Sequence, residues 1–238
     1  MGFRSKFISL IQNYVRKIKR DNNYTIDKNI LFVDFVLIIK KRIYQQSRGG
    51  VSRIFGIRTK GNLFIGKSVT IDHKAHLRAG VNLIIEDNVY INALGVVGIS
   101  IGDNVTIQRN SILVCTGVIQ NLGKGIIICD NVGINARAYI GGQGGVTINK
   151  NVIIGPDVKI FSENHVFDNL QKPIKQQGEK RNEVIIQDDC WIGAGAILLA
   201  GVVLGKGCIV AAGSVVNKSF PDYSIIGGVP AKLLKSRQ

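Results

Sequence analysis

Residues 186–216 read IQDDCWIGAGAILLAGVVLGKGCIVAAGSVV, and a large aliphatic residue recurs in this stretch at every sixth position. These recurring residues are Ile186, Ile192, Leu198, Leu204, Val210 and Val216. Gly, Asn or Asp often follows them, and a small or β-branched residue tends to return four places later. A six-residue period matches neither the 3.6-residue turn of an α-helix nor the two-residue alternation of an ordinary strand. Such a fixed repeat indicates stacked, repeated units.

The same six-residue step is found in five earlier segments of the chain. Its positions there are Ile65, Ile71, Leu77; Ile85, Ile91, Val97; Ile101, Ile107, Leu113; Ile128, Ile134, Ile140; and Ile148, Ile154, Ile160. Each hexad reads as one short strand and one turn, and three hexads make one coil of a three-sided prism. In such a prism the aliphatic residues point inward and stack as ladders, while the backbone pairs with the coils above and below. Gly, Asn and Asp tolerate the backbone dihedrals that the corners require.

The spacing of the segments locates a protruding loop. The segments begin at residues 65, 85, 101, 128, 148 and 186, and the largest excess over a coil of three hexads precedes residue 186. This excess predicts a loop over residues 161–183, and loops on a rigid scaffold are where functional residues concentrate. The sequence therefore predicts an all-β prism over residues 61–220, followed by a short C-terminal helix or tail over residues 221–238.

Residues 1–60 differ in composition from the rest and are predicted to form a basic, partly helical cap or attachment segment. They hold 14 Lys and Arg against 3 Asp, a surplus of 11, out of a net charge of +15 for the chain. One helical face of residues 1–20 is apolar, with the basic residues opposite. The apolar face comprises Phe3, Phe7, Ile8, Ile11, Tyr14, Val15 and Ile18, and the basic face comprises Arg4, Arg16, Lys17 and Arg20.

This basic helix has two interpretations, and both could hold. It could cap the open end of the prism, as terminal repeats of solenoids require. It could also rest on an anionic membrane surface as an amphipathic helix. No nucleic-acid-binding motif accompanies the charge, so we expect no nucleic acid partner. The longest apolar run, Ile30–Ile39, is too short to span a membrane, and the N-terminus lacks a signal-peptide pattern. We expect a cytoplasmic protein, with the inner face of the membrane as the alternative location.

The four cysteines are Cys115, Cys129, Cys190 and Cys208, and they lie inside hydrophobic repeats with no C-x-x-C pair. We interpret them as small buried apolar residues, with a catalytic cysteine as the lesser alternative.

Three stretches carry a resemblance to a known family: NVIIGPDVKIFSENH (151–165), DDCWIGAGAILLAGVVLGKGCIVAAGSVV (188–216) and YSIIGGVPAKLLK (223–235). They resemble the hexapeptide-repeat acyltransferases, and among these the maltose/galactoside and polysaccharide O-acetyltransferase group. The resemblance runs from about Ile126 to Lys235; residues 61–125 match only as repeats and residues 1–60 do not match. It implies a left-handed parallel β-helix, a homotrimer and an acyl-CoA co-substrate. The handedness comes from the resemblance, because periodicity does not determine it.

His165 is the predicted catalytic base. It is one of only three histidines and stands in the polar segment SENHVFDN at the start of the long loop. Imidazole is the usual base for acyl transfer to a hydroxyl, although a lone loop histidine alone would read as a solvated residue. The resemblance favours the base, because the family's catalytic histidine occupies this place. Glu163, or a backbone carbonyl, would hold the ring in the needed tautomer, and we also count Glu163 among the acceptor-binding candidates.

Asn135 is the second acceptor-binding candidate. In sugar acetyltransferases of the resembled group, an asparagine one coil before the catalytic histidine contacts the acceptor, and GINARAYI places Asn135 there. An ordinary corner asparagine is an equal alternative. The family's acidic acceptor-binding residue would fall near Gln143, in GGQGG. This departure argues against assigning a galactoside or maltose as the acceptor by resemblance alone.

The co-substrate site is predicted from the C-terminal coils. The small residues of WIGAGA and VAAGSVV would let backbone amides approach a pantetheine arm. The resemblance places Ala194 and Ala212 beside that arm and Trp191 beside the active-site groove. It also places Lys218, Lys232 and Lys235 near the phosphates of coenzyme A, although each could equally be a solvated surface lysine.

The resemblance implies direct transfer from acetyl-CoA to a sugar hydroxyl of a bacterial capsule, O-antigen or exopolysaccharide, or of a precursor. Two alternatives stay open. One is an N-acyltransferase for an amino sugar nucleotide, which would use the same histidine. The other is a non-catalytic or metal-dependent prism that uses the H-x-x-H pair His73 and His76, although solvated turn histidines explain this pair better. We expect no metal.

Overall fold

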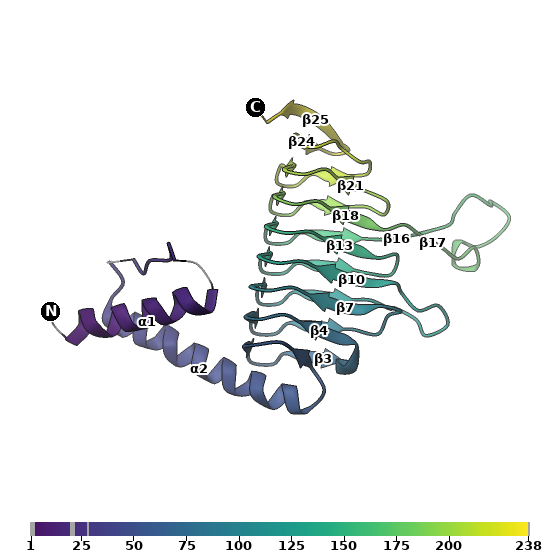
Figure 1. Ribbon diagram of the computed structural model, residues 1–238. Coiled ribbons are helices and arrows are strands. Elements are labelled where there is room, and N and C mark those ends of the chain that lie inside the picture. Colours follow the sequence, from purple (N-terminus) through teal and green to yellow (C-terminus); the bar gives the residue numbers. More distant parts are fainter. Residues whose placement is uncertain (1–2, 20–21, 28, 238) are drawn as a thin grey trace.

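The protein is a three-sided prism of stacked β-strands with two helices beside its N-terminal end, as Figure 1 shows for the computed structural model. The structure describes residues 3–19, 22–27 and 29–237. Along the prism, successive coils pair through parallel strands on each of the three faces. The predicted parallel β-helix is confirmed.

The chain passes in turn over three faces, which we call A, B and C. Face A consists of β1 (Arg58–Thr59), β4 (Leu77–Ala79), β7 (Gly98–Ile101), β10 (Gly125–Ile128), β13 (Val146–Ile148), β18 (Val184–Ile186) and β21 (Val203–Leu204). Face B consists of β2 (Leu63–Ile65), β5 (Leu83–Ile85), β8 (Thr106–Ile107), β11 (Gly133–Ile134), β14 (Ile153–Ile154), β19 (Trp191–Ile192), β22 (Ile209–Val210) and a terminal hairpin, β24 (Ser224–Gly228) and β25 (Ala231–Ser236). Face C consists of β3 (Thr70–Asp72), β6 (Tyr90–Asn92), β9 (Ile112–Val114), β12 (Tyr139–Gly141), β15 (Lys159–Phe161), β20 (Ile197–Leu198) and β23 (Val215–Val216).

The inward-pointing aliphatic ladders form the core, with one exception to the predicted positions. Val97 is 54% exposed, whereas the other twenty chosen hexad positions are buried. Leu77 pairs with Ile99 of the next coil, so the coil between them is longer than three hexads. The extra residues put Val97 in the loop before β7, and Ile99 takes the inward position instead. The prediction for Val97 was therefore wrong by a shift of register.

Asparagines line the corner between faces A and B. Their side-chain amides form a ladder along the prism, in which each Nδ2 donates to the Oδ1 of the next; the ladder runs through Asn62, Asn82, Asn104, Asn131 and Asn151. All but the first have a positive φ, near 59°. Asparagine adopts this left-handed conformation more readily than most residues, which explains why the repeat places it at corners.

Two helices precede the prism: α1 (Phe3–Lys19) and α2 (Phe32–Ile54). The predicted helix at residues 1–20 is thus present, and α2 is a second helix that the sequence did not indicate. Along α1, Ile8, Ile11 and Val15 are half-buried and Tyr14 is exposed. Phe7 makes edge-to-face contacts with Phe32 and Phe35 of α2. The side chains of Phe3, Arg4, Ile18 and Arg20 lie outside the described residues.

The C-terminal half of α2 covers the free edge of β2. Arg48 donates from Nε to the carbonyl oxygen of Ile65 at 2.8 Å. Gly49 is buried so close to β2 that a Cβ at this position would overlap the carbonyl oxygen of Leu63. This contact covers the edge of face B in the first coil, and the cap and the membrane surface both remain predicted roles of the N-terminal segment.

A buried carboxylate joins α2 to the prism. Glu86 lies at the end of β5, and its side chain is only 7% exposed. Its two oxygens accept from Lys41 Nζ at 2.7 Å, Arg42 Nη1 at 2.8 Å and Gln45 Nε2 at 3.0 Å. Burial raises the pKa of Glu86, but the hydrogen bonds and charges of Lys41 and Arg42 outweigh burial and leave the pKa below its ordinary value.

The helices leave an apolar groove against face B. This groove has a volume of about 720 Å³, and α1, α2 and the outward side chains of face B line it, among them Tyr14, Phe35, Phe64 and Ile84. None of the described helices is long and apolar enough to cross a membrane.

The C-terminal residues differ from the prediction. In place of a short helix or tail, β24 adds in parallel to β22 and turns back through β25, which pairs with β24 in antiparallel register. The hairpin extends face B by two strands, so it caps the upper end of the prism. The sequence YSIIGGVP reads as a strand and a turn once the ladder below it supplies a pairing edge.

Candidate functional site

A two-stranded hairpin projects from the corner between faces C and A and carries His165. It consists of β16 (Glu163–His165) and β17 (Glu179–Arg181), and Figure 1 shows that it extends away from the prism. A short 3₁₀ helix (Ile174–Gln176) lies in the segment between the strands. The hairpin accounts for the extra length of chain between Ile153 and Trp191, which pair in successive coils. It lies within the loop predicted at residues 161–183.

The register of the hairpin decides which side chains surround His165. Glu163 faces Arg181, and His165 faces Glu179. Backbone bonds from Asn182 N to Ser162 O and from Val166 N to Gly178 O place the hydrogen-bonded pairs on either side of these residues. Both side-chain pairs are therefore of the closer, non-hydrogen-bonded kind, and the four side chains share one side of the hairpin. His165 itself is exposed.

The carboxylate of Glu163 is paired with Arg181. Arg181 Nε donates to Glu163 Oε2 at 2.8 Å. The structure thus gives Glu163 a partner other than His165, and it places Glu179 directly across from the imidazole. Sequence reasoning missed Glu179, because only the strand register shows which carboxylate faces the histidine.

Arg181 also joins the hairpin to a second loop at the same corner. Its Nη1 donates to the carbonyl oxygen of Leu122 at 3.0 Å and its Nη2 to that of Asn121 at 3.2 Å. These carbonyls belong to the loop of residues 115–123, which is closed by a bond from Gly123 N to Thr116 Oγ1 at 2.8 Å. Nothing in the sequence pattern indicated that these two loops meet.

Asn135 lies on a different corner, between faces B and C. Its Nδ2 donates to the carbonyl oxygen of Ile154 in the next coil at 2.9 Å, and the residue is exposed. The amide therefore retains its side-chain oxygen for a ligand. The structure fits both the acceptor-binding prediction and the ordinary corner asparagine.

Ala194 and Ala212 lie along the same corner as Asn135, and both are exposed. Among the described residues, neither of their backbone N–H groups has a hydrogen-bond partner. Gly155 and Gly193 lie directly below them, where a Cβ would come within 2.7 Å of the nitrogen of Ala194 and 2.6 Å of that of Ala212. Glycine at these two positions thus leaves the backbone nitrogens of Ala194 and Ala212 uncrowded, and their role at the co-substrate remains a prediction.

The remaining predicted residues spread over the upper coils. Trp191 projects from face B and is 53% exposed. Lys218 follows β23 at the corner between faces C and A, with Nζ 5.6 Å from the centroid of the Phe220 ring. Lys232 and Lys235 are exposed on β25. Within one chain, the predicted residues therefore occupy face B and two corners of the prism, B–C and C–A, with His165 on a different corner from Asn135, Ala194 and Ala212.

Two family models match coils of the prism. A model described as bacterial transferase hexapeptide (six repeats) matches residues 183–218, and one described as hexapeptide repeat of succinyl-transferase matches residues 82–115. The chain therefore carries the hexapeptide repeat of bacterial transferases in at least two groups of coils.

Curated acetyltransferases match the chain over part of their own length. A Mycobacterium tuberculosis protein named a probable acetyltransferase is 32% identical over 182 residues, which cover 76% of this chain and 52% of that protein. An Escherichia coli K12 protein, provisionally named an O-acetyl transferase of lipopolysaccharide biosynthesis, is 32% identical over 121 residues, which cover 48% of this chain and 62% of that protein. The chain thus spans between half and two thirds of these relatives.

A solved structure shows the same architecture. A variant of an N-acyltransferase from Bacillus cereus, in complex with dTDP and coenzyme A, has a TM-score of 0.52 and 23% identity, covering 79% of this chain and 88% of that one. At this identity the likeness shows the fold.

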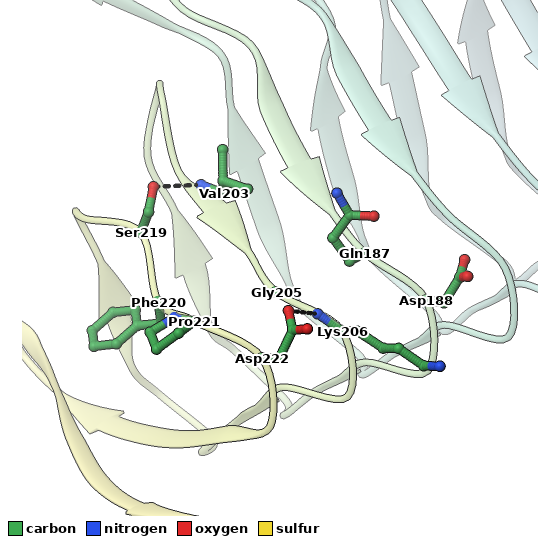
Figure 2. A pocket seen from close by; sticks show the side chains of 9 residues that line it. All are labelled: Gln187, Asp188, Val203, Gly205, Lys206, Ser219, Phe220, Pro221 and Asp222. Atoms are coloured by element: carbon green, nitrogen blue, oxygen red, sulfur yellow. Dashed lines mark hydrogen bonds between the residues drawn. The ribbon is translucent and has the colours of Figure 1, made fainter.

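A shallow cavity near the upper end of the prism contains none of the predicted site residues. It has a volume of about 520 Å³ and lies where faces A and B meet, with Gln187, Lys206, Phe220 and Asp222 in its lining (Figure 2). Two side chains there accept hydrogen bonds from backbone amides: Ser219 Oγ accepts from Val203 N, and Asp222 Oδ1 accepts from Lys206 N. These bonds join successive coils, so we assign the residues that line the cavity a structural role.

The cysteines are buried or half-buried, as expected for apolar core residues of a hexapeptide prism. Burial raises the pKa of the Cys115 thiol to about 12, so this side chain is a neutral thiol at physiological pH. His73 precedes a short 3₁₀ helix (Lys74–His76) and His76 ends it; both are exposed, in agreement with solvated turn histidines. In the part of the chain that the structure describes, no three His, Cys, Asp or Glu side chains are grouped so as to hold a metal ion.

Proposed function

We propose that the protein is an acetyl-CoA-dependent O-acetyltransferase that modifies a sugar hydroxyl of a bacterial glycan or of its precursor. The observation that carries this proposal is an exposed histidine, His165, on a hairpin that projects from a hexapeptide prism. Capsule, O-antigen or exopolysaccharide would supply the glycan. The assignment of the Escherichia coli relative to lipopolysaccharide biosynthesis favours this setting.

The proposed reaction is a direct transfer within a ternary complex. The neutral imidazole of His165 takes the proton of the sugar hydroxyl while the oxygen attacks the thioester carbonyl carbon. The tetrahedral intermediate then collapses with cleavage of the C–S bond, and the proton passes from the imidazolium to the leaving thiolate. The outward N–H groups of Ala194 and Ala212 are available to the pantetheine arm or to the developing oxyanion.

A homotrimer would complete the site. His165 lies at one corner of the prism, whereas Asn135, Ala194 and Ala212 lie along another. In a cyclic trimer every copy presents both corners, so one copy's hairpin can face the next copy's row of N–H groups. The proposed groove therefore lies between two prisms, with Trp191 beside it and the lysines of the upper coils, Lys218, Lys232 and Lys235, near the phosphates of coenzyme A.

Mixed assemblies test the shared groove. His165→Ala removes the base from one corner, and Ala194→Trp blocks the other corner without touching His165. Each variant alone is expected to be inactive as a trimer. When the two are co-expressed, about a quarter of the grooves combine an intact histidine with an intact neighbouring corner, so activity returns to roughly that fraction. A mixed trimer that stays inactive would show that the groove is not shared.

The test of the reaction itself is acceptor-stimulated thiol release from acetyl-CoA. The purified protein is incubated with a panel of sugars, oligosaccharides and sugar nucleotides, and each stimulating product is treated with mild base, which cleaves esters and leaves amides. A base-labile product supports O-transfer. A base-stable product would instead establish the N-acyltransferase alternative. If coenzyme A derivatives neither bind nor react, the proposal fails, and the non-catalytic prism stands in its place.

We also propose that the basic N-terminal segment places the enzyme at the cytoplasmic, inner face of a membrane. Helix α2 presents an outward apolar stripe of Val33, Leu37, Tyr44 and Val51, all exposed, and Lys40 lies within it. Apolar side chains flanked by cations are the composition that binds an anionic bilayer surface. A contact between copies would instead bring segments with a surplus of 11 positive charges together.

Sedimentation with vesicles tests this location. The protein is expected to sediment with vesicles that contain phosphatidylglycerol and to stay in solution with pure phosphatidylcholine. Leu37→Glu with Tyr44→Glu should abolish binding, while the matched exposed substitution Gln46→Glu should not. Equal binding to both lipids, or a stripe variant that binds normally, would contradict the membrane contact; a change in oligomer size instead would assign the stripe to a second copy.

A further inference from the structure

Both protruding segments of the prism leave the corner between faces C and A, and one side chain joins them. Figure 1 shows the β16–β17 hairpin and the loop before β10 extending from the same side of the molecule. Arg181 lies between them and is only 17% exposed. Its guanidinium donates to Glu163 on the hairpin and to the carbonyl oxygens of Asn121 and Leu122 on the loop of residues 115–123.

The direction of Arg181 fixes the side of the hairpin that faces this loop. In an antiparallel pair, directly opposed residues project to the same side, and residues two apart on one strand do so as well. Arg181, Glu163, His165 and Glu179 therefore project from the same side. Because Arg181 reaches the loop from that side, His165 projects toward the loop's side too, about 7 Å further out along the strand.

We propose that Arg181 is a positioning residue, which holds the His165 hairpin against the loop of residues 115–123 and makes that loop the second wall of the acceptor site. This inference rests on the proposed acyl transfer. The wall exposes Val118, Ile119 and Leu122, so it favours an acceptor that has an apolar face next to the reacting hydroxyl.

The arrangement requires an arginine. The planar guanidinium serves three acceptors at once, two of them carbonyl oxygens on a loop 59 and 60 residues away in sequence. A lysine ammonium would keep the charge and the pairing with Glu163, but its single nitrogen cannot reach all three acceptors in the same geometry. Displacement of a catalytic base by about 1 Å is enough to lower a rate by roughly 10²-fold.

The experiment compares Arg181→Met and Arg181→Lys with Lys150→Met, which removes an exposed ion pair with Asp130 (3.1 Å) on another corner of the prism. Steady-state rates are measured with acetyl-CoA and with the acceptor that stimulates thiol release. We expect Arg181→Met to lower kcat by about 10- to 100-fold and to raise the acceptor KM, with little change in the acetyl-CoA KM. The kcat of Arg181→Lys should lie between those of the wild type and Arg181→Met. Added guanidinium should partly restore the kcat of Arg181→Met, and Lys150→Met should have wild-type kinetic constants.

Amide hydrogen exchange separates this inference from the proposed function, because it needs no activity. In Arg181→Met, the amides of Val166 and Asn182, which hold the hairpin together, should exchange faster, while those of the prism strands keep their protection. Unchanged exchange in the hairpin overturns the inference, whatever the enzyme does. Faster exchange with an unchanged kcat also overturns it. In that case Arg181 would stabilise the hairpin, but the position of His165 would not depend on it. A wild type that is inactive toward all acceptors, with faster exchange in the variant, refutes the proposed function and leaves the structural tie in place.

Discussion

Replacing Glu86 with alanine is expected to detach α2 from the prism without unfolding the prism. Glu86 has a nearly buried carboxylate that accepts from Lys41, Arg42 and Gln45 of α2. Lys41 and Arg42 are 51% and 37% exposed and can turn to water when the carboxylate is removed. Gln45 is fully buried, so the Nε2 hydrogens that it directs at Glu86 lose their acceptor.

The size of the effect follows from these contacts. Hydrogen bonds to a charged group contribute about 1.5–3 kcal/mol, and a buried donor left without a partner costs about 1–3 kcal/mol. The exposed parts of Lys41 and Arg42 discount the ionic contribution, because solvent screens it. We therefore expect Glu86→Ala to weaken the attachment of α2 by about 2–4 kcal/mol.

Two optical signals separate helix detachment from unfolding of the prism. Circular dichroism at 222 nm reports α1 and α2, and Trp191, the only tryptophan, reports face B. In urea, the variant should lose helical signal at lower concentration than Trp191 fluorescence changes, whereas Lys150→Met should keep the wild-type order of transitions. Coincident transitions at the wild-type midpoint would refute the reasoning.

The remaining predictions concern acid stability, core register, the cap and the thiols. Because the folded pKa of Glu86 is below its ordinary value of 4.5, its stabilisation should be present above that pH and disappear as the pH falls through the folded pKa, and Glu86→Ala should lack this acid transition in urea titrations. Ile99→Ala should lower the free energy of unfolding by about 2–5 kcal/mol, while Val97→Ala should change it by less than about 0.5 kcal/mol; the reverse order would contradict the register. Gly49→Ala should cost about 1–3 kcal/mol by calorimetry, because its Cβ would overlap the carbonyl oxygen of Leu63. Cys115 should not react with an aromatic disulfide reagent at neutral pH until the protein is unfolded, and rapid labelling of the folded protein would disprove its burial.

The hexad pattern was sufficient to predict the prism because each inward position is decided locally. An aliphatic residue every sixth position, with a turn-forming residue after it, specifies a strand and a corner without reference to distant residues. The wrong prediction for Val97 also comes from this local reading. A corner of unusual length interrupts the six-residue period, and after the interruption either Val97 or Ile99 can be taken as the inward residue. Pairing of Leu77 with Ile99 across coils resolves that choice.

The helix α2 was harder to predict from its sequence. The run Ile30–Ile39 was recognisably apolar, but its outward residues are apolar as well, which obscures the helical period. Gly49 and Gly50 also lower the helix propensity of its C-terminal part. Helix α2 is stabilised by its contact with β2 and by its ion pairs with Glu86. Both are tertiary interactions, so the local sequence does not reveal them.

The candidate site, too, could be predicted from the sequence only in part. His165 could be selected from a motif, because the hairpin begins where the repeat is interrupted. The residues around His165 could not be predicted, because strand register and loop contacts determine which side chains lie near it. The register places Glu163 opposite Arg181 and Glu179 opposite the imidazole. The tie from Arg181 to Asn121 and Leu122 joins loops that are far apart in the chain, and no local pattern encodes it.

The most direct test of the account is the rate of acetyl transfer by His165→Ala, measured as thiol release from acetyl-CoA with an acceptor that stimulates the wild type. Binding of acetyl-CoA, followed by calorimetry, confirms that the variant keeps its groove. The account predicts normal binding and a loss of about 10²- to 10⁴-fold in kcat, the range expected for removal of a general base. Full activity in the variant would contradict the assignment of His165 as the base.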